Sequence, residues 1–152
     1  MARTIRRARE RQALADLFNL QRFVDAQAPV YVEVVRELEA GEKRSHWMWF
    51  VFPQIAGLGV SPTSVFFAIS SLDEAKAYMA HPILGARLIE CAGLVLAADG
   101  KTATQIFGPV DAAKFRSSMT LFSCAAPEVA VFTQCLDRFF DGDPDPSSLE
   151  RL

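Results

Sequence analysis

Apolar residues recur at every third or fourth position along most of the chain, which is the spacing of one face of an α-helix. The clearest stripes are Leu17, Leu20, Val24 and Ala28; Val30, Val34 and Leu38; Leu84, Leu88, Cys91 and Val95; Phe115, Met119 and Phe122; and Val131, Cys135, Leu136 and Phe139. No segment alternates clearly between apolar and polar residues, as a half-buried strand would. The pattern predicts an all-α fold, a single compact multihelical domain of six to eight helices.

Capping and helix-breaking residues divide this pattern into elements. Asp16 and Asp111 are candidate N-caps, and Gly41 suits the position just after a helix. Ser71 with Glu74, and Thr102 with Gln105, match the capping box, in which two side chains satisfy each other's free backbone donors. The predicted helices cover about residues 16–28, 29–40, 71–80, 82–98, 102–107, 111–124 and 127–141, with a further start at Ser61-Pro62 and the longest at 82–98.

Residues 41–59 interrupt the helical pattern. The cations Lys43 and Arg44 run directly into an apolar run, 47–52, that holds both tryptophans, and Pro53 ends that run. Periodicity cannot distinguish a buried strand from two buried helical turns here. Since no partner strand is evident, we expect a short buried helix or an extended segment pinned among helices. Cationic, hydroxyl, imidazole and aromatic side chains in one stretch are typical of the wall of a binding site.

Length and charge set the domain organisation. The 152 residues fit one domain, which we divide into a basic N-terminal tail, 1–13, and a globular part, 14–152. We expect the tail to be polar and solvated, or a loose helix. The net charge of −2 and pI near 5.7 argue against a dedicated nucleic-acid-binding protein. The tail is the local exception, because it contains Arg3, Arg6, Arg7, Arg9 and Arg11.

Cysteine usage and hydropathy bear on location and cofactors. The three cysteines, Cys91, Cys124 and Cys135, are widely spaced and form no C-x-x-C pair, so we expect reduced thiols in a cytoplasmic protein. No apolar run approaches the length of a membrane span, and no secretory signal is recognised. The chain lacks a G-x-G-x-x-G or Walker A motif and a metal-ligand spacing, so we expect no cofactor and no metal site.

Three groups of residues form one longer pattern along the chain. They are Lys43-Arg44-Ser45-His46-Trp47-Met48-Trp49-Phe50 with Phe52-Pro53-Gln54, Gly57-Leu58-Gly59 and Ser61; Glu74-Ala75 with Tyr78, His81-Pro82, Leu84-Gly85 and Arg87-Leu88; and Ile106-Phe107-Gly108 with Asp111 and the run 114–122. In this pattern the chain resembles the bacterial DUF1810 family over about residues 16–150. The resemblance implies a small, soluble, mostly helical protein, from a family with no established activity.

Two positions depart from the family pattern. Phe67 stands where a tyrosine is common, and Val60 where a basic residue is common. If the family uses that tyrosine hydroxyl in a reaction, the change to Phe67 would remove it here. A more distant similarity is to the NADAR group of helical domains, which implies an ADP-ribose-like ligand.

The first candidate site cluster lies at residues 43–47. Arg44 offers a planar fork that matches phosphate or carboxylate, with Lys43 and Ser45 beside it. His46 is a candidate general acid or base, and Trp47 a stacking surface. The alternative interpretation is that the cations are solvated, His46 caps backbone carbonyls, and the tryptophans belong to the core.

The second cluster lies at residues 111–120. Asp111, Lys114 and Ser118 share one helical face, and Ser117 lies beside them. These groups could hold an anion, with Asp111 as a second catalytic candidate beside His46. Gln54 could read an amide or base edge, or tie down its own loop. The alternative for the helix is a capping aspartate, an exposed lysine and serines bonded to the helix backbone.

The favoured function is binding of, or action on, a small anionic ligand, nucleotide- or ADP-ribose-like, in a pocket between the 43–54 stretch and the 111–120 helix. Whether the protein is an enzyme stays open. The main alternative is a protein-interaction or structural module in which a homodimer hides the aromatic stretch. A third interpretation is a salt-dependent nucleic-acid contact made by the Arg-rich tail.

Overall fold

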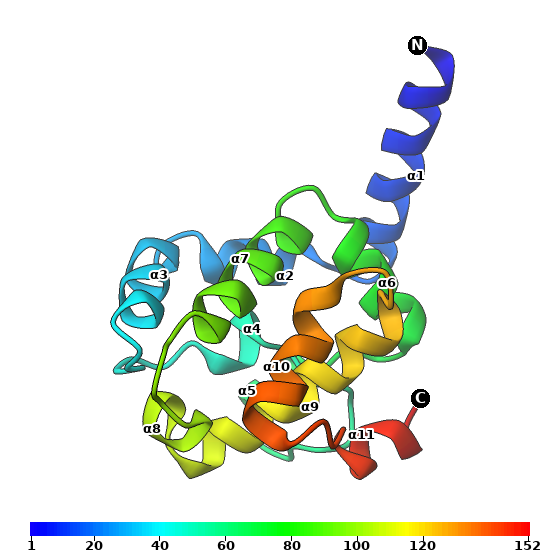
Figure 1. The fold of residues 1–152 in the computed structure, drawn as a ribbon. Coiled ribbons are helices and arrows are strands. Elements are labelled where there is room, and N and C mark those ends of the chain that lie inside the picture. The colour runs from blue at the N-terminus through cyan, green and yellow to red at the C-terminus, as the bar shows by residue number, and fades with distance from the viewer.

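The computed structural model describes all residues from Met1 to Leu152 and contains helices only, apart from one isolated β-bridge. The eleven helices are α1 (Ala2–Leu17), α2 (Gln21–Gln27), α3 (Tyr31–Glu39), α4 (Met48–Val51), α5 (Pro62–Phe66), α6 (Leu72–Ala80), α7 (Leu84–Leu96), α8 (Ala103–Phe107), α9 (Pro109–Ala125), α10 (Ala130–Phe140) and α11 (Pro146–Glu150). The all-α prediction is confirmed (Figure 1). The count exceeds six to eight because α1 and α4, for which the sequence left a helix as one of two alternatives, are helical, and because α11 was not predicted.

Helix α9 is the central element, with α6, α8, α10 and α11 packed around it. Its predicted apolar face, Phe115, Met119 and Phe122, is fully buried. On the other side of α9, Ser117 and Leu121 are also buried, and α11 packs against α9. At 17 residues α9 is the longest helix. The helix expected to be longest, 82–98, is the shorter α7, with 13 residues.

Several predicted helix ends are confirmed and others are displaced. Thr102 and Gln105 form the complete capping box, and Ser61 caps α5 by accepting from the Ser64 N–H. Asp111 does not cap α9, because the chain enters that helix through Gly108, at φ 81°, and Pro109. Asp111 instead lies in the first turn of α9, where the positive end of the helix dipole stabilises its negative charge.

The start of the chain differs from the expected 16–28 helix. Helix α1 extends through Asp16 and ends at Leu17, and the chain then turns at Asn19, which has φ 50°. Asp16 therefore accepts a hydrogen bond from Gln12 within α1 rather than capping α2. Most of α1 projects from the body of the protein, and only its last turns rest against α6 (Figure 1).

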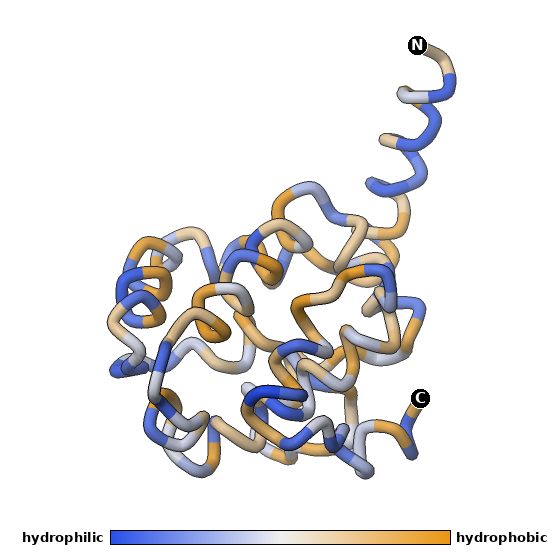
Figure 2. Tube along the Cα trace, in the orientation of Figure 1, coloured by the Kyte–Doolittle hydropathy of each residue, from blue (hydrophilic) through white to orange (hydrophobic).

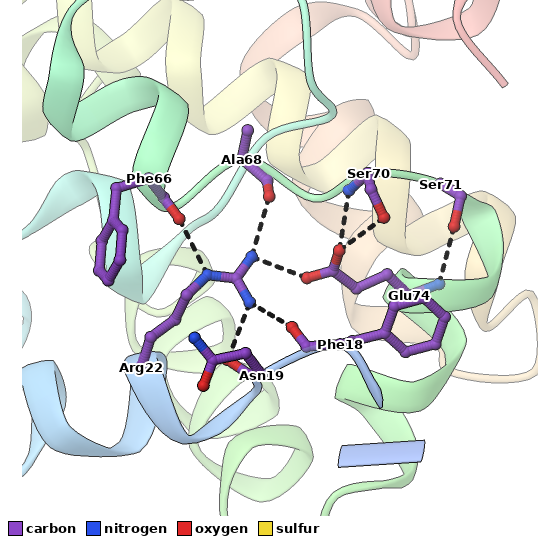
Figure 3. A network of polar contacts seen from close by, with 8 residues as sticks. All are labelled: Phe18, Asn19, Arg22, Phe66, Ala68, Ser70, Ser71 and Glu74. Atoms are coloured by element: carbon purple, nitrogen blue, oxygen red, sulfur yellow. Dashed lines mark hydrogen bonds and ion pairs between the residues drawn. The ribbon is translucent and has the colours of Figure 1, made fainter. Parts of the chain in front are cut away.

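A buried polar clamp joins α2 to the α5–α6 connection (Figure 3). The Arg22 guanidinium donates to the carbonyls of Phe66 and Ala68 and lies 2.8 Å from the Glu74 carboxylate. Glu74 also accepts from the Ser70 N–H and hydroxyl, so the second bond of the predicted Ser71–Glu74 capping box goes to Ser70. Ser71 still accepts from the Glu74 N–H.

Helices α6 and α7 meet at a tight elbow. The His81 ring accepts from the Ile83 and Leu84 N–H groups at 3.1 and 3.3 Å, so this histidine caps the start of α7. A Cβ at Gly85 would lie 2.2 Å from the Met79 carbonyl oxygen, so only glycine permits this approach. No single helix is long and apolar enough to cross a membrane; only α6 and α7 counted together, bent by 92°, meet that test of length and composition.

The 41–59 stretch combines both structures that the sequence left open. Residues Met48–Val51 form the short helix α4, and Ile55 then pairs with Ile69 through the isolated parallel bridge. The Gln54 carbonyl accepts from the Ile69 N–H, and the Ala56 N–H donates to the Ile69 carbonyl, each at 2.8 Å. These two hydrogen bonds fix the chain around Ile55 against Ile69, and the residues that follow Gln54 line a groove with α9.

Candidate functional site: a groove between the Gln54–Ser64 segment and α9

Glu37 of α3 organises the beginning of the candidate site. Its buried carboxylate accepts from the N–H groups of Arg44 and Ser45, from the Ser45 hydroxyl, and from the Trp47 indole at 3.1 Å. Burial alone would raise the pKa of Glu37, but these four hydrogen bonds outweigh it and lower the pKa. The loop therefore has one fixed path around an ionised carboxylate.

Lys43, Asp111 and Lys114 form a chain of charges between this loop and α9. The Lys43 ammonium lies 2.9 Å from one Asp111 oxygen, and the Lys114 ammonium 3.8 Å from the other. Each ammonium also lies over a tryptophan ring: Lys43 over Trp47 at 5.1 Å, and Lys114 over Trp49 at 5.0 Å. The two predicted clusters thus meet through Lys43 and Asp111.

An open groove of about 300 Å³ lies beside Lys114. Its walls come from the Gln54–Ser64 segment, which ends in the first turn of α5, from one face of α9, and from the start of α11. The polar side chains among its lining residues are Gln54, Ser64, Lys114, Ser117, Asp145 and Ser147. A smaller cavity continues past Gln54 and Ser64 toward Trp49 and Phe67. Lys114 is the one cation among the residues that line the groove.

Asp145 fixes the third wall. One of its carboxylate oxygens, Oδ2, accepts from the Ser148 N–H and hydroxyl, which caps α11, and from the Ser117 hydroxyl at 3.0 Å. The Thr120 hydroxyl accepts from the Asp145 N–H. Burial would raise the pKa of Asp145, but the bonds from Ser148 and Ser117 outweigh it, so the pKa is lowered. The second oxygen, Oδ1, has no partner within the protein.

The structure brings together only some of the predicted site residues. Gln54, Lys114 and Ser117 line the groove, and Lys43 and Asp111 lie next to it as an ion pair. Ser118 is fully buried, and its hydroxyl has no hydrogen-bond partner. It belongs to the interior of the protein rather than to the groove lining.

The other predicted residues of the first cluster lie elsewhere. The Arg44 side chain is 73% exposed and pairs with Glu42, and His46 is exposed on the same loop. Ser45 is held by Glu37. Trp47 is 1% exposed and packs against Phe52 in the core, so neither face of its ring is open to a ligand. None of these four side chains lines the groove.

Sequence reasoning missed four residues of the site: Trp49, Ser64, Asp145 and Ser147. Trp49, which the sequence analysis placed in the core as one alternative, is half-buried and lines the small cavity. Asp145-Pro146 followed by Ser148 is an N-cap signature that could have predicted α11. Nothing local indicates that Asp145 meets Ser117, because that contact joins distant parts of the chain.

The thiols and possible metal ligands give no second chemical centre. All three cysteines are free, and burial raises the pKa of both Cys91 and Cys135 to about 12, which keeps them as unreactive thiols. The structure contains no group of three or more His, Cys, Asp or Glu side chains arranged to hold a metal ion.

Comparison with known sequences identifies the family. The family model described as "Protein of unknown function (DUF1810)" matches residues 17–152, which is most of the chain. The chain belongs to the DUF1810 family. The match covers the groove and all three of its walls, and it begins at the last residue of α1.

A solved structure of similar sequence shows the same fold. The crystal structure of the conserved hypothetical protein Rv1873 from Mycobacterium tuberculosis is similar to this chain, with 52% sequence identity and a TM-score of 0.88. The alignment covers 89% of this chain and 96% of the other. A search of curated proteins gave no match. These comparisons establish family and fold, and neither description names a ligand or reaction.

Proposed function

We propose that this DUF1810 protein binds a small anionic ligand, bearing a phosphate or carboxylate, in the groove beside Lys114. The observation that carries the proposal is the ammonium of Lys114, which is the one cation in the groove lining. Lys43 is paired with Asp111 at 2.9 Å, whereas Lys114 lies 3.8 Å from the same carboxylate. Lys114 therefore keeps most of its capacity to bind an anion.

The neighbouring side chains define the rest of the ligand. Gln54, Ser64 and Ser147 offer amide and hydroxyl groups, and Asp145 has a free oxygen that can accept from a ligand hydroxyl or amine. The small cavity toward Trp49, at about 10 Å³, has room for no more than about one water, so it bounds the ligand and does not hold a sugar or a base. A ligand with an anionic end and a donor-rich end, such as a sugar phosphate or mononucleotide, fits this arrangement.

The size of the groove supports a small ligand. Its volume of about 300 Å³ lies at the lower end of the range for small-molecule sites, roughly 300–1,000 Å³. A ligand as large as ADP-ribose would extend beyond the groove. We therefore favour a compact phosphorylated or carboxylated molecule within the nucleotide-like class.

Binding is supported better than catalysis. Asp111 is occupied by two ammonium groups, and His46 does not line the groove. The lowered pKa of Asp145 makes it a weak proton acceptor. A catalytic role for His46 and Asp111 would require the His46 loop to move.

A thermal-shift screen with matched variants tests the proposal. The panel contains inorganic phosphate, sugar phosphates, mononucleotides, ADP-ribose and dicarboxylates, and the proteins are wild type, Lys114→Met and, as control, Arg44→Ala. A ligand at ~100 times its dissociation constant stabilises by about 2.7 kcal/mol, which is a shift of several degrees. We expect this shift in wild type and Arg44→Ala and its loss in Lys114→Met. An equal shift in all three proteins, or none from any compound, would contradict the proposal.

A second candidate function is supported by exposed apolar side chains near the groove. Val60 is 95% exposed, and Val65, Phe66 and Val110 are also largely exposed. Such side chains are typical of a docking surface for a protein or a second copy of the chain. Light scattering of wild type and Phe66→Ser over a concentration series tests this: a homodimer that the substitution weakens would support it, and a monomer throughout would contradict self-association.

A further inference from the structure

Helix α1 carries a dense cationic surface that the rest of the fold leaves unoccupied. Five arginines, Arg3, Arg6, Arg7, Arg9 and Arg11, lie within its first three turns, where Glu10 is the one acid. All five side chains are exposed, and none makes an ion pair or side-chain hydrogen bond. This part of the helix stands clear of the other elements (Figure 1), and hydrophilic residues dominate it (Figure 2).

The charge of the protein is divided in space. Residues 1–17 contain five arginines and two acids, a net charge of +3, so the remaining residues carry −5 and the total is −2. The low overall pI therefore describes the body of the protein and not α1. Such charge asymmetry is typical of a chain that contacts a polyanion through one segment.

We propose that α1 is an arm that binds double-stranded DNA through its phosphate backbone, without reading sequence. The cations are all arginine, whose planar fork binds phosphate oxygens bidentately. At 3.6 residues per turn the five side chains spread over roughly 200° of the helix surface. A helix about 10–12 Å wide fits a major groove about 12 Å wide, and arginines on both flanks then reach both strands.

The composition of α1 favours this partner over an anionic membrane. A helix that lies on a membrane needs an apolar face to insert between the lipids. In the projecting part of α1 the one large apolar side chain after Met1 is Ile5, and the next is Leu14, near the body. Ile5 lies outside the arc of arginines, on a side of α1 that it shares with Ala8 and Gln12. One large apolar side chain among small and polar ones is too little for a face that inserts into a membrane.

This inference goes beyond the ligand groove and is independent of it. None of the five arginines lines the groove. The DUF1810 match begins at residue 17, so the arm lies outside the part of the chain that defines the family. A DUF1810 body with a DNA-binding arm would bring its groove to DNA, whatever the groove binds.

Fluorescence anisotropy with a short mixed-sequence DNA duplex and the full chain tests the arm. The variants replace Arg3, Arg6, Arg7 and Arg9 together, by Gln or by Lys. Arg11 is kept because it lines a cavity with His81 at the base of α1. The body control is the pair Arg36→Gln and Arg44→Gln, since both arginines are exposed on the body. Thermal unfolding confirms that each variant is folded.

We expect wild-type binding at low salt whose logarithm falls with log salt at a slope of about −4, since each neutralised phosphate contributes about −0.9. The Gln variant should bind at least ~10-fold more weakly with a slope near −1, whereas the Lys variant should keep the slope and the body control should match wild type. Three results would overturn the inference: equal binding by the Gln variant, tighter binding to phosphatidylserine vesicles than to DNA, or an arginine-dependent dimer in place of DNA binding.

Discussion

The ammonium of Lys43 lies 2.9 Å from the Asp111 carboxylate, and the two side chains differ in how much water reaches them. Lys43 is 8% exposed and Asp111 20% exposed. Lys43 has one carboxylate partner, whereas Asp111 has Lys43 and Lys114. Because a buried charge without a partner is costly, the two halves of this pair should not be equally replaceable.

Asp111→Ala should therefore destabilise the protein more than Lys43→Met. The aspartate variant leaves the Lys43 ammonium buried beside Trp47 without a counter-charge, at a cost of about 3 kcal/mol. The lysine variant leaves Asp111 with Lys114 and solvent, at a cost of about 1 kcal/mol. Urea denaturation of both variants measures the order, and a larger loss in Lys43→Met would show that Lys114 does not compensate.

Asp111→Asn should strengthen anion binding in the groove. The amide oxygen can still accept from Lys43, while the negative charge that competes for Lys114 is removed. Titration with the anion selected by the thermal-shift screen should give an affinity about 3–10 times higher than wild type, equivalent to ~1 kcal/mol. Weaker binding in Asp111→Asn would instead assign Asp111 a direct role with the ligand.

Ser117→Ala and Ser118→Ala form a matched pair on adjacent positions of α9. The Ser117 hydroxyl shares its one proton between the Asp145 carboxylate and the Ala113 carbonyl, so its loss should cost about 1.5 kcal/mol and loosen α11. The buried Ser118 hydroxyl has no partner, so its removal should leave stability unchanged within about 0.5 kcal/mol or raise it. Thermal unfolding compares them, and a large loss in Ser118→Ala would reveal a hydrogen bond absent from the structure.

Glu37 should make the protein less stable in acid. Its folded-state pKa is lowered, so below the unfolded pKa of about 4.3 the unfolded chain binds a proton that the folded protein excludes. This stability is complete above about pH 5 and is lost as pH falls toward the folded pKa. Denaturation at pH 3 to 7 should show a shallower acid loss for Glu37→Gln, which is also about 2 kcal/mol less stable at pH 7. Parallel curves for the two proteins would assign the acid loss to other carboxylates.

Arg22→Lys should destabilise the protein although it keeps the charge. The guanidinium donates to four backbone carbonyls and to Glu74, which three donors on a flexible ammonium cannot reproduce (Figure 3). We expect a loss of about 3 kcal/mol. The control Arg36→Lys changes an exposed pair with Glu33 and should be within about 0.5 kcal/mol of wild type. If both variants lose the same free energy of unfolding, the hydrogen-bond geometry of the Arg22 guanidinium does not contribute to stability.

Local signals in the sequence predicted local structure well. The Thr102–Gln105 capping box and the Ser61-Pro62 helix start depend on residues a few positions apart, and both are confirmed. The buried stripe of Leu84, Leu88, Cys91 and Val95 was predicted for the same reason. The prediction that Asp111 caps α9 was wrong, because Gly108 and Pro109 just before it begin the helix two residues earlier.

The candidate site was less accessible from sequence because its geometry depends on distant partners. Trp47 and Trp49 look alike in sequence, yet Glu37 binds the indole of the first and draws it into the core, while the second remains at the cavity. Likewise, only the fold shows that Lys43 meets Asp111 and that Asp145 meets Ser117.

The groove is assembled from three separate parts of the chain, and this links its occupancy to the motion of the C-terminal helix. A ligand held between Lys114 of α9 and Ser147 of α11 would bind only while α11 is docked. A ligand that contacts both α9 and α11 therefore lowers the population of molecules in which α11 has separated from α9. Amide hydrogen exchange in residues 147–150 would slow in proportion to occupancy, so the last helix can report what the groove binds.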